Sequence, residues 1–365
     1  MKTASSQTET NSSKDASAQS VPAPEMKPRV LFARALIGVI VLICAEVFSG
    51  ASLSAGLWHP WTVLVTYWLY FAHFFFFTTL AVRTGRTSVA SLYLWGVLFG
   101  LYESWITKVI WSGYSGDGKL AMGSIGPYGF SEISMVFFFH PVMSFILPLT
   151  IACLLCPALR ALFPDLAWFT GKSKGARIVW IYLLVSFVPI MAMNSGGAIN
   201  LAANLAVAIL LFLLLLRLAR PALTASDARS IVVFGRFGFA GLCVYLVLLY
   251  VVTYVFMRPG GLPSVPVQLF TFVFYALTVS GLLLHRRREP MPTAPIEKRE
   301  LRLVVILFAV LIALALVCTL LPEMSVLYPV IAVTFVIWTF GGFLLTLLCL
   351  LNGARERFRE VGSKQ

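Results

Sequence analysis

The 365-residue chain is 59% hydrophobic and only 12% charged, and its mean hydropathy is +0.89. A soluble domain of this length must cover itself with polar surface, and about a quarter of its residues would be charged, so the composition excludes a soluble protein. The net charge of +13 comes from basic residues scattered between apolar segments, which argues against nucleic-acid binding and instead indicates membrane topology.

The chain opens with residues 1–29, which are rich in Ser, Thr, Ala, Gln and Pro, and we expect them to form a disordered cytoplasmic tail. The first apolar run starts too late and continues too long for a cleaved signal peptide. From residue 30 to 351, apolar stretches of about 20 residues, enough to cross a bilayer, alternate with short connections. They predict an all-α, polytopic transmembrane bundle with spans at 31–52, 61–82, 88–111, 131–156, 178–194, 197–216, 231–257, 264–284, 303–322 and 327–351. Residues 352–365 form a basic tail.

The polar run from Asn194 to Gly197 leaves the fifth and sixth spans open to two interpretations. They are two separate short helices, or one helix that is broken within the membrane. The charge pattern supports the first interpretation, because merging the two spans would put dense basic loops on both sides of the membrane.

Basic residues alternate strictly along the chain. The two tails and every second connection carry clusters of Lys and Arg, whereas the remaining connections contain only Lys119 and Arg258. Lys and Arg in short loops stay on the cytoplasmic side, so the pattern predicts ten spans with both termini cytoplasmic, in the plasma (inner) membrane. The basic run at 285–300 is expected to lie against anionic lipid headgroups, which makes membrane lipids the predicted partners.

All six cysteines fall inside or at the edges of apolar segments, so we expect no disulfide framework. Cys153 and Cys156 form a C-x-x-C pair, but no second pair or nearby His completes a metal site. We therefore predict that they are small packing residues. No metal and no cofactor is indicated.

Ionisable groups in hydrocarbon are costly and are functional candidates by default. Glu46, Glu103 and His140 lie about 9, 12 and 14 Å below the predicted outer surface, at about 1.5 Å per helical residue. Asn200 and Asn204, one turn apart, reach roughly 5 to 10 Å below the same surface. The shared depth predicts an outward-facing polar pocket built by spans one, three, four and six.

Span three carries Gly96, Gly100 and Ser104 four residues apart, a pattern that lets another helix approach closely. Glu103 falls near the same helical face, so its carboxylate is expected to point into the bundle. Three interpretations remain open: Glu103 binds a substrate, ion or proton; it only fixes packing through hydrogen bonds from neighbouring helices; or it lies at a span boundary and snorkels towards the interface.

Span four places His140 directly before Pro141, with Ser144 on the same helical face. Proline removes a backbone donor, so the carbonyl of Phe137 loses its usual partner and the helix is expected to kink. The imidazole then serves as a gate, a proton acceptor or a ligand site, or it is a buried histidine satisfied by one carbonyl.

Three functions follow from these features. The preferred one is a carrier or solute-binding protein for a small molecule, since the chain has many spans, small loops and no soluble catalytic domain. The first alternative is a membrane-embedded enzyme that acts on a lipid or lipid-linked substrate near the outer leaflet, with Glu103 or His140 as general base. The second is a non-catalytic membrane scaffold.

Overall fold

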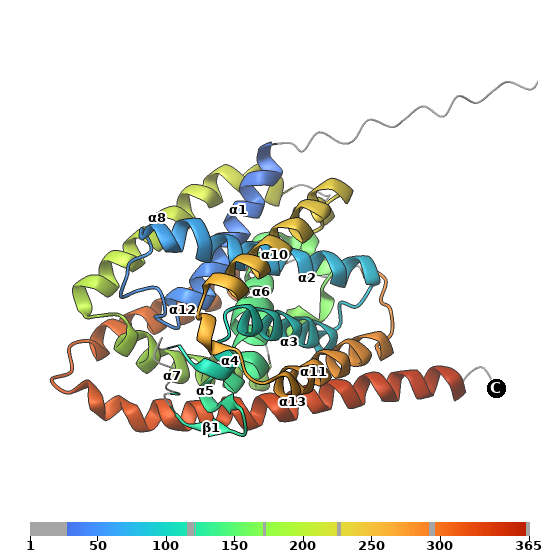
Figure 1. Cartoon of the computed structure of the whole chain (residues 1–365). Helices are drawn as coiled ribbons and strands as arrows, with labels where there is room; N and C mark the ends of the chain where they lie inside the picture. The colour runs from blue at the N-terminus through green and yellow to red at the C-terminus, as the bar shows by residue number, and fades with distance from the viewer. Residues whose placement is uncertain are drawn as a thin grey trace, which may run out of the picture.

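A computed structural model describes residues 28–114, 120, 122–170, 173–224, 228–291 and 296–362. Within these residues, ten helices are long and apolar enough to cross a membrane, and they form one helical bundle (Figure 1). The predicted all-α membrane architecture is therefore confirmed. The predicted tail at residues 1–29 lies almost wholly outside the described residues.

The first five spans are assembled partly from unusual helical turns. Span one is α1 (Pro28–Leu42) followed by the π-helical segment η1 (Ile43–Val47), and span two is the π-helical η2 (Thr62–Thr66) followed by α2 (Tyr67–Thr84). Span three is α3 (Val89–Ile106). Span four joins α5 (Phe130–Ser134), the π-helical η3 (Met135–Ile146) and α6 (Leu147–Leu155), and span five is α7 (Lys174–Asn194).

The last five spans are mostly regular α-helices. They are α8 (Ala198–Leu223), the short α9 (Arg229–Val232) with α10 (Arg236–Phe256), α11 (Val265–Leu284), α12 (Lys298–Cys318), and the 3-10 turn η7 (Met324–Leu327) with α13 (Tyr328–Gly362). The connections hold the short helix α4 (Val109–Ser112), the 3-10 turns η4 (Pro157–Ala161), η5 (Pro164–Thr170) and η6 (Pro259–Gly261), and strands β1 (Ser124–Ile125) and β2 (Tyr128–Gly129). The strands pair antiparallel, with Ser124 opposite Gly129.

Several boundaries differ from those expected. The third helix ends at Ile106, ahead of the expected end at 111, because Lys108 adopts a left-handed conformation with φ of 60° and starts α4 in a new direction. Spans five and six are separate helices, since Gly196 and Gly197 both have positive φ and break the chain between α7 and α8. The tail at 352–365 continues α13 as helix to Gly362.

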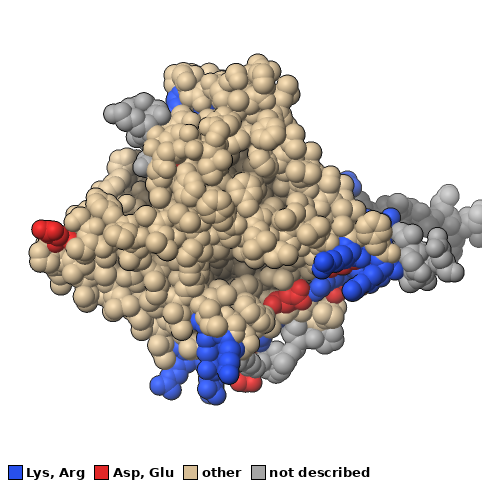
Figure 2. All heavy atoms as spheres, turned by 90° about the horizontal axis from the view of Figure 1, so that it is seen from below, with Lys and Arg blue, Asp and Glu red and all other residues tan. Residues whose placement is uncertain are grey.

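The core lies in the first half of the chain. In each of the first five spans, 56 to 83% of the 18-residue apolar stretch is buried inside the protein, against 17 to 28% in each of the last five. The sequence analysis predicted that span six, which is α8, helps to build the polar pocket. In the structure, only 22% of its 18-residue apolar stretch is buried. The later helices therefore form the perimeter of the bundle. The face seen in Figure 2 is largely uncharged, and its Lys and Arg side chains gather in a few patches.

Contacts between connections define two ends of the bundle. At the end that we call the basic end, Arg34 donates to backbone carbonyls of residues 230–233, Arg83 to Phe234, and Arg86 to the end of α11. At the opposite end, Asn194 donates to the Ser49 carbonyl and Arg258 to the Thr107 carbonyl. Alternate connections therefore meet, as expected of ten antiparallel spans.

Candidate functional site

An acid–imidazole pair lies between α3 and η3. The Oε2 atom of Glu103 is 3.3 Å from Nε2 of His140, and Nδ1 of the same ring is 3.1 Å from the Ser144 hydroxyl. The His140 side chain is 4% exposed and that of Glu103 is 15% exposed. An imidazole held between a carboxylate and a hydroxyl can pass a proton to either side, so the arrangement is suited to binding and exchanging a proton.

The glycine face of α3 makes this contact possible. A Cβ atom added at Gly96 would collide with the backbone of Pro141, and one at Gly100 would lie 2.9 Å from the Val136 carbonyl oxygen. The two helices thus pack backbone to backbone, as the spacing of small residues predicts. The close approach holds Glu103 of one helix against His140 of the other.

Pro141 explains the π-helical shape of η3. Proline has no backbone N–H to donate, and its ring crowds the preceding turn, so the helix widens over Met135–Ile146. The Tyr93 hydroxyl donates to the Phe137 carbonyl that the proline leaves without its usual partner. Short π-helical segments occur often at functional sites, and His140 lies in the middle of the π-helical η3.

Glu46 lies on a second π-helical turn, η1, and is 8% exposed. The Ser52 hydroxyl donates to its Oε2 atom at 2.6 Å, and the Tyr70 side chain lies within hydrogen-bonding reach of the carboxylate. Its charge is near enough to interact with the charges of Glu103 and His140. Three helices therefore supply two acids and one imidazole to one region.

Aromatic rings separate this region from the rest of the bundle. The ring of Phe99 stacks on both imidazoles, with its centroid 5.3 Å from that of His140 and 4.8 Å from that of His73. Nδ1 of His73 is hydrogen-bonded to the Leu69 carbonyl at 2.7 Å, whereas its buried Nε2 atom has no partner among the described residues. The π-faces of such rings also attract cations.

Tyr114 lies at the end opposite the basic end, where its carbonyl accepts a hydrogen bond from Arg258. It is 53% exposed, and the charges of Glu46, Glu103 and Glu132 all interact with it. Glu132 is buried, accepts a hydrogen bond from Ser131 at 2.7 Å and leaves its Oε1 atom unpartnered among the described residues. The surroundings of the site on this side are therefore acidic.

Asn200 and Asn204 hold a loop in place. Both amide groups donate to the Leu53 carbonyl, at 2.6 and 3.1 Å, and the Leu57 amide donates to Asn204 at 2.7 Å. These bonds fix the connection that carries Ser52, the hydrogen-bond donor to Glu46. The structure thus gives the two asparagines a positioning role beside the acid–imidazole pair.

Six residues were candidates from the sequence, and the structure treats them differently. Glu103, His140 and Ser144 lie in direct contact, Glu46 lies within range of their charges, and Asn200 and Asn204 contact the loop. The sequence analysis missed Tyr70, Phe99 and His73. They lie in spans so rich in aromatic residues that no periodicity distinguishes a wall of the site from ordinary packing. In the described part of the chain, no three His, Cys, Asp or Glu side chains are grouped to hold a metal ion.

Among the comparisons with known proteins, a family model covers most of the chain. The model of a family described as an uncharacterized membrane protein family matches residues 35–360. An uncharacterized protein of Archaeoglobus fulgidus is 40% identical over 117 residues, which are 32% of this chain and 36% of that protein. The chain thus spans about a third of the length of this relative. No solved structure matches.

Proposed function

Starting from the finding that the chain belongs to an uncharacterized membrane protein family, we propose that it is a membrane carrier that binds a small cationic solute at Glu103 and His140 and exchanges it for a proton. One observation carries the proposal, namely the 3.3 Å contact between the Glu103 carboxylate and the His140 imidazole across two closely packed helices. A proton shared by this pair can leave when a positive charge arrives.

The charge of the surroundings favours a cation. Glu46 beside the pair and Glu132 on the Tyr114 side add two carboxylates. Two positively charged groups at this end, Lys108 and Arg258, donate to backbone carbonyls, and the carboxylates of Glu46, Glu103 and Glu132 outnumber them. A negatively charged solute would meet repulsion here.

The positive-inside rule puts the basic end in the cytoplasm, and the site then lies in the outer half of the membrane. A carrier in this orientation takes up its solute from outside. A reporter fused to the C-terminus and accessible from outside intact cells would overturn this orientation.

Proton release on binding tests the proposal. The purified protein in weakly buffered detergent is titrated with small organic cations (primary amines, guanidinium and quaternary ammonium ions) and with matched organic anions, while a pH-sensitive dye reports the medium. We expect at least one cation to acidify the medium saturably, and Glu103→Gln to weaken its binding about tenfold or more, because a buried charge partner is lost.

Glu323→Gln is the matched control, since Glu323 is an exposed carboxylate that precedes the tenth span. This variant should release protons like the unchanged protein. Acidification that is equal in Glu103→Gln and the unchanged protein, or absent for every cation tested, contradicts the proposal.

A second candidate function is supported by an apolar cavity of about 180 Å³ beside η1. Ile43, Cys44, Val47 and Phe48 line it and flank Glu46, and Ile209 on its α8 side is 46% exposed. Such a cavity suits an acyl chain, which favours an enzyme that acts on a lipid near Glu46. Conversion of a bilayer lipid by the purified protein, lost in Glu46→Gln, would distinguish this function from transport.

A further inference from the structure

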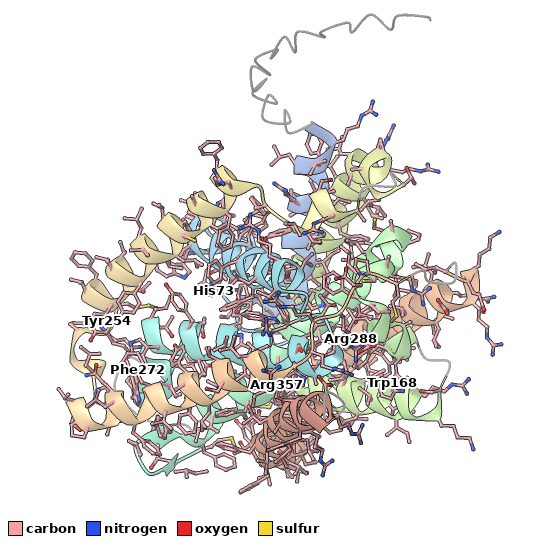
Figure 3. The ribbon with its side chains drawn as sticks, turned by 90° about the vertical axis from the view of Figure 1, so that its right-hand side faces the viewer. His73, Trp168, Tyr254, Phe272, Arg288 and Arg357 are labelled. Carbon is pink, nitrogen blue, oxygen red and sulfur yellow. The ribbon has the colours of Figure 1, made fainter. Side chains whose placement is uncertain are left out.

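The basic end of the bundle contains a cavity of about 240 Å³. One side of the cavity is formed by the end of α2 and the turn after it, and the other side by the chain that follows α11. The start of α9 and the residue after η4 complete the lining. The lining includes four arginines from three separate segments: Arg83, Arg229, Arg287 and Arg288. Figure 3 views this end of the molecule and labels Arg288.

The walls of this arginine cavity are held in place by hydrogen bonds. The Arg288 amide donates to the Gly85 carbonyl at 2.7 Å, and the Met291 amide donates to the Ala161 carbonyl at 2.9 Å. Gly85 has φ of 67°, and an added Cβ would lie 3.2 Å from the Arg288 carbonyl oxygen. The glycine turn and the segment after α11 therefore form one fixed surface.

Two of the four arginines are already engaged. The Arg288 guanidinium contacts both oxygens of Asp165, at 2.7 and 2.8 Å, and the Asp165 carboxylate also accepts the Val89 amide. Arg83 donates to the Phe234 carbonyl at 2.7 Å and lies over the ring of Phe239. Both guanidinium groups are thus positioned before any ligand arrives.

The guanidinium groups of the other two arginines, Arg229 and Arg287, have no hydrogen-bond or ion-pair partner among the described residues. Asp165 neutralises Arg288, and Glu289 in the wall can balance one more charge, so two positive charges remain. Burial, and then the charge of Arg287, lowers the pKa of nearby Arg86. The cavity therefore concentrates positive charge that the described protein does not balance.

We propose that this cavity binds a phosphate-bearing anion through Arg229 and Arg287, with Arg83 beside them. Guanidinium groups are planar forks that match phosphate oxygens in pairs, and Arg229 and Arg287 are exposed, so a ligand can reach them from solvent. The Thr87 side chain in the lining supplies a hydroxyl donor, whereas the Thr84 hydroxyl already donates to the Leu80 carbonyl. The phosphate belongs either to an anionic lipid headgroup or to a soluble phosphorylated molecule.

The test compares the full-length protein with Arg229→Gln/Arg287→Gln and with a matched control, Arg299→Gln/Arg302→Gln. The control removes the same charge from exposed arginines at the start of α12, which do not line the cavity. One arm measures retention of phosphatidylglycerol by native mass spectrometry after mild detergent removal. The other arm titrates inorganic phosphate and pyrophosphate against thermal unfolding in nanodiscs of zwitterionic lipid.

We expect the cavity variant to bind about tenfold or more weakly than both the unchanged protein and the control, because two charge-assisted contacts are lost. Retained phosphatidylglycerol identifies a headgroup site, and saturable stabilisation by phosphate or pyrophosphate identifies a soluble ligand. Equal loss in the cavity variant and the control, or no binding of either probe by the unchanged protein, overturns the proposal. The ligand-free unfolding midpoint of the cavity variant should match that of the control, which excludes misfolding as the cause.

Discussion

Lys108 illustrates how a buried charged residue can have a structural role. Its buried ammonium group donates to the carbonyls of Met257 and Arg258, at 2.6 and 3.1 Å, directly after α10 ends at Phe256. A cation at the carbonyl end of a helix satisfies orphan acceptors and opposes the negative pole of the helix. Lys108 therefore joins the end of span three to the end of span seven.

Replacing Lys108 by Met should destabilise the protein by about 2 kcal/mol, because two carbonyls lose a charged donor. The measurement is the fraction of monodisperse protein that survives a temperature series in detergent. Lys298→Met, at an exposed position, is the control and should behave like the unchanged protein. A Lys108→Met protein as heat-resistant as this control would show that the cap contributes nothing.

At the scale of the element, the contact between α3 and η3 determines whether the acid–imidazole pair exists. Gly96 faces the backbone of Pro141, which cannot move as a flexible side chain could. Gly241 in the middle of α10 offers a matched comparison, since an added Cβ there would meet nothing within 4 Å. The same substitution therefore probes a close packing contact in one helix and open space in the other.

Gly96→Ala is expected to lower stability by about 1–3 kcal/mol through overpacking and to weaken the cation-dependent proton release assigned to Glu103. Gly241→Ala should be neutral or slightly stabilising, because alanine is the better helix former. Thermal survival and proton release of the two purified variants provide the measurement. If both alanine variants behave alike, α3 and η3 do not depend on the glycine contact.

The elements also show what could be predicted from the sequence. Hydrophobic length and the small-residue spacing on span three are local features, so the ten spans and the inward direction of Glu103 followed from them. The left-handed turn at Lys108 depends on the carbonyls after α10, which lie 149 and 150 residues away along the chain. No local pattern contains that information. The places of Tyr70, Phe99 and His73 beside the site could not be predicted either, because their spans are so rich in aromatic residues that no periodicity singles them out.

At the scale of the whole molecule, the two ends of the bundle have different chemistry. The acid–imidazole site and Tyr114 belong to one end, and the arginine cavity belongs to the other. The sequence predicted this polarity from charge alternation, but it did not predict which helices face the outside. Span six was expected to be a wall of the pocket, whereas α8 exposes most of its surface and contributes through loop contacts at its first turns.

The account is tested most directly by gradient-driven transport in proteoliposomes. A permanently charged organic cation found to bind is supplied outside vesicles with an acidic lumen, and empty vesicles correct for leakage. We predict that the cation accumulates in vesicles with the unchanged protein or with Glu323→Gln, and that a protonophore abolishes this accumulation. Vesicles with Glu103→Gln should accumulate none. Accumulation that is indifferent to the pH gradient, or that persists in Glu103→Gln, would contradict proton exchange at the Glu103–His140 pair.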